Sequence, residues 1–178
     1  MTALALTWGT TPAERTRPFP CDALLVAPDA LYYRGVTVAA PAADVFRWLC
    51  QLRVAPYSYD WLDNLGRRSP RALTPGLDPV AVGQRVMTIF DLVAFEPDRH
   101  LTIRMRSGTP AARVFGDVAV SYVVEAEGPA RCRLLAKLVV RYPAGAVGRV
   151  MRALLPWGDL FMMRKQLLTL KALAEGRR

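Results

Sequence analysis

The segment YSYDWLDNLG, residues 57–66, contains the residues of this chain whose types and spacing are best suited to chemistry. A tyrosine phenol can donate a hydrogen bond to a ligand carbonyl, so Tyr57 and Tyr59 are candidate ligand-orienting groups. Asp60 is a candidate general base if an apolar environment raises its pKa. We therefore predict catalytic roles for Tyr59 and Asp60, and ligand contacts for Tyr57 and Trp61.

The same segment also fits a packing role. At helical spacing, Trp61, Leu62 and Leu65 would form a buried face, and the acidic side chains would lie in solvent. Gly66 would end this helix, because glycine commonly stops helices at the C-terminus. The sequence leaves open whether the two tyrosine hydroxyls and Asp60 face a cavity or water.

His100 is the single histidine of the chain and the third candidate catalytic residue. Its imidazole titrates near neutral pH, as an acid–base catalyst requires. It follows a Pro-Asp-Arg turn, however, where an exposed histidine without a catalytic role is the simpler interpretation. No Ser/His/Asp or Cys/His arrangement and no Gly-rich phosphate loop is visible. Any catalysis would therefore depend on isolated acids and bases and on the shape of a cavity.

Three cysteines, Cys21, Cys50 and Cys132, are far apart in the sequence. With one histidine and no CxxC pair, the chain lacks the ligand spacing of a zinc site. We predict three reduced, mostly buried thiols, no metal and no cofactor.

The composition fits one folded domain. The chain has 178 residues, of which 52% are hydrophobic and 22% charged, which excludes a disordered charged tail. No apolar run approaches the roughly 18–20 residues of a membrane span. The N-terminal residues lack the basic start and cleavage site of a signal peptide, so we expect a cytoplasmic protein.

The net charge of +9 is compatible with nucleic-acid binding, but the distribution of the basic residues along the chain argues against it. The 24 basic residues are mostly single and scattered, and no recognition helix or aromatic–basic repeat is present. We predict no nucleic-acid partner. Weak attraction to acidic surfaces at low salt stays compatible with this charge.

Hydrophobic periodicity predicts an α+β fold. Residues 1–30 are rich in proline and threonine and are expected to form an arm packed on a single domain of residues 31–178, with a short helical turn at Pro12 that either Thr10 or Thr11 caps. Residues 42–52 have helical spacing. Alternation with a period of two predicts antiparallel strands over residues 33–39, 84–97, 100–107, 116–128 and 131–143.

The strands have one apolar and one polar face, so something must cover the apolar face. Residues 144–175 supply a helical pattern for this purpose, and Pro156 and Gly158 within it predict a kinked or two-part helix. A few large apolar residues should line whatever cavity lies beneath that helix. We select as ligand-binding candidates Phe90, Met105, Tyr122 and Phe161.

Several segments carry a family resemblance between about residues 8 and 175. They are WGTT, RPFPCD, VTVAAPAADVFRWLCQL, YSYDWLDNLGRR, FEPDRHLTIR and MMRKQLLTLKALAE. With the order of elements, they resemble a bacterial branch of the START/Bet v 1-like (SRPBCC) superfamily, which includes polyketide cyclases and lipid-transfer proteins. The resemblance implies a helix-grip fold: an antiparallel sheet wrapped around a long C-terminal helix, with two short helices after strand one.

The resemblance also implies a cavity between the sheet and the long helix that holds a hydrophobic or aromatic small molecule. Relatives of this kind either cyclise or dehydrate the ligand without a cofactor, or only carry or sense it. A protein-interaction module with a basic face is a further alternative. The resemblance transfers no catalytic residue, and the sequence does not predict the oligomeric state.

Overall fold

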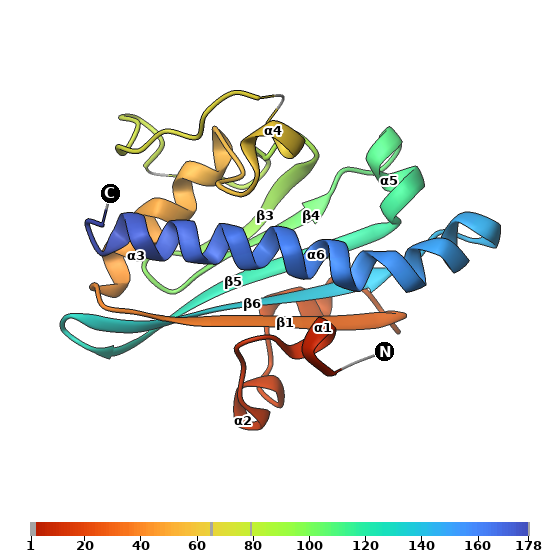
Figure 1. Ribbon diagram of the computed structural model, residues 1–178, viewed down its shortest axis with the longest axis horizontal. Helices are drawn as coiled ribbons and strands as arrows, with labels where there is room; N and C mark the ends of the chain where they lie inside the picture. Colours follow the sequence, from red (N-terminus) through yellow and green to blue (C-terminus); the bar gives the residue numbers. More distant parts are fainter. Residues whose placement is uncertain (1–2, 65, 79, 178) are drawn as a thin grey trace.

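A six-stranded antiparallel sheet organises the chain, in the order β1-β6-β5-β4-β3-β2. A computed structural model describes residues 3–64, 66–78 and 80–177 (Figure 1). The strands are β1 (Ala30–Val38), β2 (Arg85–Val86), β3 (Phe90–Glu96), β4 (His100–Met105), β5 (Asp117–Gly128) and β6 (Arg131–Arg141). The helices are α1 (Ala3–Thr7), α2 (Pro12–Arg15), η1 (Pro20–Ala23), α3 (Ala42–Cys50), η2 (Gln51–Arg53), α4 (Asp60–Asp63), α5 (Pro110–Phe115) and α6 (Gly145–Ala174).

The alternation of the strand sequences gives the sheet an inner face that packs against helices. Ile103 of β4 lies opposite Val120 of β5, and Val120 lies opposite Leu138 of β6, all in the main core. Tyr32 of β1 continues this row beside Leu138. The expected apolar inner face is confirmed, whereas the outer face, which was expected to be polar, also carries buried apolar residues such as Leu135 and Val139 of β6.

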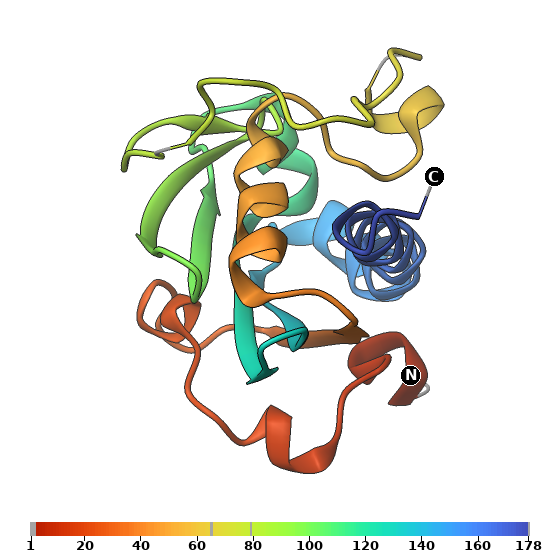
Figure 2. The ribbon, with the colours of Figure 1, turned by 90° about the vertical axis from the view of Figure 1, so that its left-hand side faces the viewer.

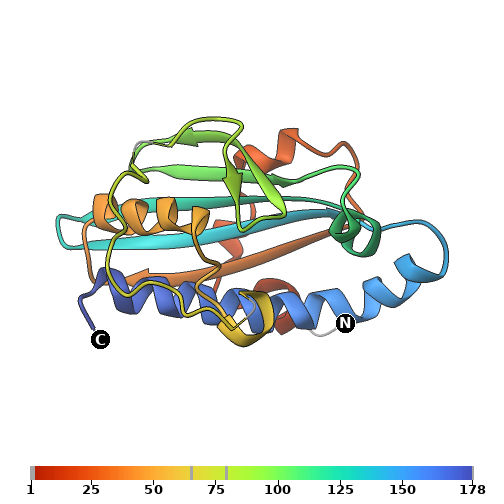
Figure 3. The same cartoon turned by 90° about the horizontal axis from the view of Figure 1, so that it is seen from above.

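Two helices cover the inner face. α3 and α6 lie along the same side of the sheet and contact each other (Figures 1 and 3). α3 buries Val45, Trp48 and Leu49 at helical spacing. α6 has 30 residues and runs through Pro156 without interruption. It changes direction in its N-terminal part (Figure 1), so it is a bent helix rather than two separate ones.

The N-terminal residues pack against the outer face and the β1 edge. Thr11 and Glu14 form a reciprocal capping box that starts α2. Phe19 and Leu25 are buried in a second apolar cluster with residues of β5 and β6. Lys137 of β6 is buried beneath η1, where its ammonium group lies 2.5 Å from a carboxylate oxygen of Asp22.

Three local predictions are wrong. Residues 84–97 form two strands, because Met87 and Thr88 adopt positive φ and reverse the chain. α5 occupies the connection between the strands predicted over residues 100–107 and 116–128, where we expected no helix, and Thr109 caps it by accepting from the Ala112 amide.

The third wrong prediction concerns the rim segment, where α4 is a single turn rather than a packed helix. Trp61 and Leu62 are exposed, so they do not form the expected buried face. Leu65, the third expected member of that face, lies outside the described residues. The Gly66 amide donates to the Asp60 carbonyl at 2.8 Å and Gly66 has φ of 77°, which fits its predicted role as a helix stop.

Candidate functional site

A cavity of about 620 Å³ lies between the inner face of the sheet and α6. The sheet contributes an apolar wall that includes Val118, Val120, Leu138 and Val140. α6 contributes Met151, Leu155, Met162 and Met163 on the opposite side. Methionine side chains adapt their shape to a ligand, so this lining suits an apolar molecule without tightly prescribing its outline.

The mouth of the cavity lies between α4 and α6. Leu62 and Leu154 both line the cavity and are exposed to solvent. Phe115, at the end of α5, and Ile89, in the turn between β2 and β3, also belong to the lining. The mouth is therefore mainly apolar, with Asp63 of α4 and Thr88 of the β2–β3 turn as its exposed polar residues.

One polar group in the lining joins the sheet to α6. The Tyr122 hydroxyl donates to Oε1 of Gln166 at 2.7 Å, and both side chains are buried. The Gln166 amide donates in turn to the carbonyl oxygen of Pro56 at 2.7 Å. The tyrosine oxygen keeps lone-pair capacity, so it can accept a hydrogen bond from a ligand hydroxyl.

The second polar group in the lining is a buried ion pair. Arg34 is fully buried on β1 and donates to Oδ2 of Asp159 at 2.6 Å. It also donates to the carbonyl oxygens of Ala5 at 2.9 Å and Pro156 at 3.4 Å. Arg34 therefore ties together α1, β1 and α6, while Asp159 belongs to the cavity lining.

Burial changes the titration of this cluster. Desolvation raises the pKa of Asp159 to about 6, and Arg34 opposes that shift. Desolvation also raises the pKa of Tyr32 and of Tyr122, and the nearby charge of Asp159 raises both further. Asp159 is thus a carboxyl group whose pKa lies near the working range of a general base.

Three of the nine residues predicted for the site line the cavity: Phe90, Met105 and Tyr122. Tyr122 is also the one that supplies a hydroxyl group there. The other six lie outside the lining, and each has a structural setting of its own.

Tyr57 is buried behind the cavity wall rather than in the lining. Its ring packs edge-on against Trp48 with centroids 5.9 Å apart. Its φ of 54° is unusual for a residue other than glycine, so the packing holds it in a costly backbone conformation. Desolvation raises its pKa to about 12, and its hydroxyl has no hydrogen-bond partner among the described residues.

Tyr59, Trp61 and Phe161 lie at the outer rim of the mouth. The rings of Tyr59 and Phe161 stack face to face with centroids 4.1 Å apart and an interplanar angle of 5°. This contact joins the start of α4 to α6. Trp61 is 71% exposed and follows directly on the same short helix.

Asp60 is occupied by a hydrogen-bonding role at the start of α4. Its carboxylate accepts from the Ser69 amide at 2.9 Å and from the Ser69 hydroxyl at 2.5 Å. An acidic side chain in the first turn also interacts favourably with the helix N-terminus. These contacts fix the loop that follows α4, and Asp60 does not reach the cavity lining.

His100 lies on the outer face of the sheet, away from the cavity. It shares that face with Thr102, whose hydroxyl pairs with Ser121 beneath the N-terminal residues at 2.8 Å. Desolvation lowers the pKa of His100, so the ring is neutral near pH 7. Because His100 and the cavity lie on opposite faces of the sheet, His100 does not contact the space inside the cavity.

The sequence interpretation missed Asp159 and Arg34, although both left a signal. Asp159 stands four residues before Met163 and seven before Gln166, so it falls on the buried stripe of the long helix. Arg34 alternates with Tyr32 and Val36 on the apolar face of the first strand. Each is a charged residue on the apolar face of its own element. Two such residues of opposite charge are a signal that their side chains can pair.

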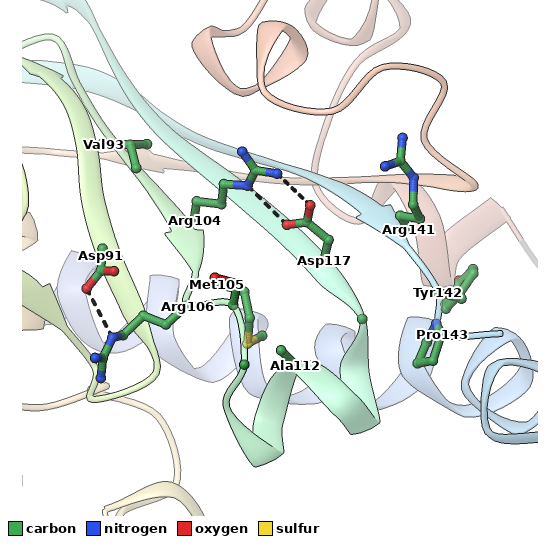
Figure 4. A pocket seen from close by; sticks show the side chains of 13 residues that line it. Asp91, Val93, Arg104, Met105, Arg106, Ala112, Asp117, Arg141, Tyr142 and Pro143 are labelled. Atoms are coloured by element: carbon green, nitrogen blue, oxygen red, sulfur yellow. Dashed lines mark hydrogen bonds and ion pairs between the residues drawn. The ribbon is translucent and has the colours of Figure 1, made fainter.

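A second pocket, of about 590 Å³, lies on the outer side of the sheet beside α5. Its charged residues already have partners: Arg104 makes two hydrogen bonds to Asp117, and Arg106 lies 3.4 Å from Asp91 (Figure 4). Arg141 stands apart from both pairs in Figure 4 and donates to the Val26 carbonyl. We therefore take the inner cavity as the candidate site.

Comparison with solved structures finds the same architecture in several bacterial proteins. A hypothetical protein from Helicobacter pylori matches with a TM-score of 0.58 and 16% identity, over 88% of this chain and 95% of the other. The chain has the helix-grip fold. A protein from Mesorhizobium loti matches it with a TM-score of 0.52 and 16% identity, over 83% of this chain and 98% of the other.

A third match of this helix-grip chain is the di-domain ARO/CYC protein BexL from the BE-7585A biosynthetic pathway. The TM-score is 0.53 and the identity 16%, over 82% of this chain and 46% of BexL. No protein-family model and no curated protein sequence matches the chain. At this level of identity the structural matches establish the fold, as the sequence resemblance implied.

Proposed function

We propose that this protein binds a hydrophobic small molecule that carries at least one polar group, in the cavity beneath α6. The observation that carries the proposal is a mainly apolar cavity of about 620 Å³ whose lining includes a few buried polar side chains, among them Tyr122, Gln166 and Asp159. Ligand pockets typically have volumes of about 300–1,000 Å³ and an apolar lining with few polar groups. The cavity matches both criteria.

The polar groups define the chemistry that a ligand should bring. A hydroxyl group can donate to the carboxylate of Asp159 or to the oxygen of Tyr122. A purely aliphatic ligand would leave Asp159 desolvated with only Arg34 as a partner, at a cost in free energy. A polycyclic or aromatic ligand with hydroxyl or carbonyl groups therefore fits better than a plain hydrocarbon.

Native mass spectrometry of protein purified from its own host tests this proposal. We expect a retained small molecule, released on denaturation and containing oxygen as well as an apolar skeleton. The same measurement on Val120→Phe, which fills the cavity, should show the ligand reduced or absent. A wild-type protein that carries nothing, and that takes up nothing from an extract of its host, would contradict the proposal.

Catalysis is the second candidate function, and the raised pKa of Asp159 is the observation that favours it. A carboxylate in an apolar cavity can take a proton from a carbon next to a ligand carbonyl. Such a step begins the cofactor-independent cyclisation or dehydration that we expected from the sequence. The likeness to BexL, an ARO/CYC protein, supports the same candidate at the level of the fold. Asp159 then replaces Asp60 and His100 as the proposed base.

The variant Asp159→Asn distinguishes the enzyme hypothesis from the carrier hypothesis. The amide keeps the shape of the side chain and can still accept from Arg34, but it cannot take up a proton. If the protein is an enzyme, turnover of the retained molecule should fall by at least about a hundredfold, which is the usual contribution of a general base, with the ligand still bound. Unchanged turnover in this variant would remove Asp159 from the mechanism, and no turnover in either protein would leave the carrier or sensor role.

A further inference from the structure

A row of exposed apolar side chains runs along α6 on the side away from the sheet. Its members follow one another at steps of three and four residues, so they share one face of the helix. Each is between 46% and 59% exposed: Val147, Val150, Leu154, Trp157 and Phe161. The opposite side of the helix buries Leu160, Met163 and Leu167. α6 is thus apolar on two sides, and the sheet accounts for only one of them.

Tyr59 covers one end of this second side where it stacks on Phe161, and the side chains of the row are otherwise about half exposed. Figure 2 views α6 end on, with the sheet to one side of the helix and no described element over the other. The row continues onto α4 through the stack of Phe161 on Tyr59, next to the exposed Trp61 and Leu62. A contiguous apolar surface of this kind on a folded protein marks an interaction site. We call these residues of α6 and α4 the apolar ridge.

The ridge surrounds the mouth of the cavity. Leu154 belongs both to the ridge and to the cavity lining, as does Leu62 on the opposite lip. Whatever covers the ridge therefore also faces the opening through which a ligand must pass.

The charges beside the apolar ridge indicate what kind of partner it binds. α6 carries five basic residues and a single acid, Asp159, which is buried against Arg34. Arg149 and Lys165 are exposed on α6, and Arg67 and Arg68 are exposed just after α4. Asp63 on α4 is the one exposed acid among the ridge residues and their neighbours on that helix. A second copy of the chain would place like-charged rows against each other, which is unfavourable.

We propose that the apolar ridge docks on an anionic lipid membrane, with the mouth of the cavity facing the lipid. Tryptophan, phenylalanine and leucine on one face, together with exposed arginine and lysine on the same helix and in the adjoining loop, is an arrangement that binds membrane interfaces. The net charge of +9 adds long-range attraction to such a surface. Among the described residues no helix could cross a bilayer, so the docking is peripheral.

This arrangement would let an apolar ligand move between the lipid and the cavity with little exposure to water. That consequence depends on the proposed function, because it requires a ligand in the cavity. The docking itself does not, since vesicle binding can be measured on protein with an empty or a filled cavity. Failure of one proposal is thus distinguishable from failure of the other.

Vesicle co-sedimentation tests the docking. We expect the purified chain to bind vesicles of phosphatidylcholine mixed with phosphatidylglycerol, and to bind pure phosphatidylcholine vesicles far more weakly. The variant Trp157→Ser/Phe161→Ser should bind the anionic vesicles at least about tenfold more weakly, because two large apolar side chains no longer enter the interface. Arg149→Gln/Lys165→Gln should weaken binding mainly at low salt.

Val26→Ser is the matched control, because Val26 is 84% exposed but lies on the N-terminal segment away from the ridge. It should bind vesicles as the wild type does. No binding of anionic vesicles by the wild type would overturn the proposal, and so would equal binding by the Trp157→Ser/Phe161→Ser variant. Light scattering that shows a dimer, dissociated by that same variant, would instead assign the ridge to a second copy of the chain.

Discussion

At the scale of single residues, the ion pair between Arg34 and Asp159 is the feature that distinguishes this cavity from a plain apolar core. Its two members come from β1 and from α6, 125 positions apart in the chain. Burial makes each dependent on the other, since an unpaired buried charge is costly. The pair therefore holds a polar side chain in a fixed position at the cavity. Its integrity also contributes to the stability of the folded protein.

The titration of Asp159 gives a prediction with a definite sign. Its pKa in the folded protein is raised to about 6 from the ordinary 3.8, so between these values the folded state binds more protons than the unfolded state. The free energy of unfolding of the wild type, minus that of Asp159→Asn, should therefore fall as pH rises through this range. The expected change is about 3 kcal/mol, and it should level off above pH of about 6.

Urea unfolding of both proteins at a series of pH values measures this difference. A difference that rises between these two pH values would show that Arg34 outweighs desolvation and lowers the pKa of Asp159. The proposed role of this carboxyl group as a base near neutral pH would then lose its support.

A double-mutant cycle tests the coupling of the pair. Arg34→Met leaves the Asp159 carboxylate buried without its cation, and should lower the free energy of unfolding by about 3–5 kcal/mol. The double variant Arg34→Met/Asp159→Leu removes both charges and should recover most of that loss. Denaturant unfolding at neutral pH provides the values. A double variant less stable than Arg34→Met alone would argue against a coupled pair.

At the scale of elements, α6 both closes the cavity and supplies one of its walls. Two of its glycines have opposite surroundings. A Cβ atom at Gly148 would lie 1.8 Å from the Pro143 carbonyl oxygen, whereas a Cβ at Gly158 would meet no atom within 4 Å. The first glycine is required for the close approach of the preceding chain, and the second is a helix position that tolerates a side chain.

These surroundings predict opposite effects of one substitution. Gly148→Ala should destabilise the protein by about 1–3 kcal/mol through overpacking. Gly158→Ala should stabilise it by about 0.5–1 kcal/mol, because alanine favours a helix. Thermal unfolding of both variants compares them directly. Stabilisation by Gly148→Ala would show that the start of α6 is placed differently.

The individual helices and strands show how much of the fold could be predicted from the sequence. Period-two alternation and helical spacing predicted β4, β5, β6, α3 and α6, because each buries one face and its pattern records that burial. The turn between β2 and β3 was missed because Met87 and Thr88 adopt positive φ, which carries no signal in residues of these types. α4 was predicted as a packed helix because the spacing of Trp61 and Leu62 suits one, yet both side chains are exposed.

The residues of the candidate site could be predicted from the sequence less completely than the fold. Phe90, Met105 and Tyr122 were identified because apolar and aromatic residues on an inner face must line any cavity there. Tyr59, Asp60 and His100 were selected for residue type, and type does not report which way a side chain points. The loop contact of Asp60 with Ser69 is a tertiary feature that local spacing could not reveal.

At the scale of the whole molecule, the chain is a sheet held between two covers. The N-terminal residues pack on the outer face, and α3 with α6 packs on the inner one (Figure 2). The inner side encloses the mainly apolar cavity, and its mouth opens beside the apolar ridge. The inner side holds both the main apolar core and this cavity, and the outer side holds the smaller apolar cluster beneath the N-terminal residues.

The central claim is that the space beneath α6 binds an apolar ligand, and titration with the neutral fluorescent probe N-phenyl-1-naphthylamine tests it most directly. Val120→Phe fills the cavity from the inner face, and Val123→Phe adds the same bulk to the same strand on the outer face. We predict saturable binding by the wild type and by Val123→Phe, and at least about tenfold weaker binding by Val120→Phe. Undiminished binding by Val120→Phe, or no saturable binding by the wild type, would contradict the claim.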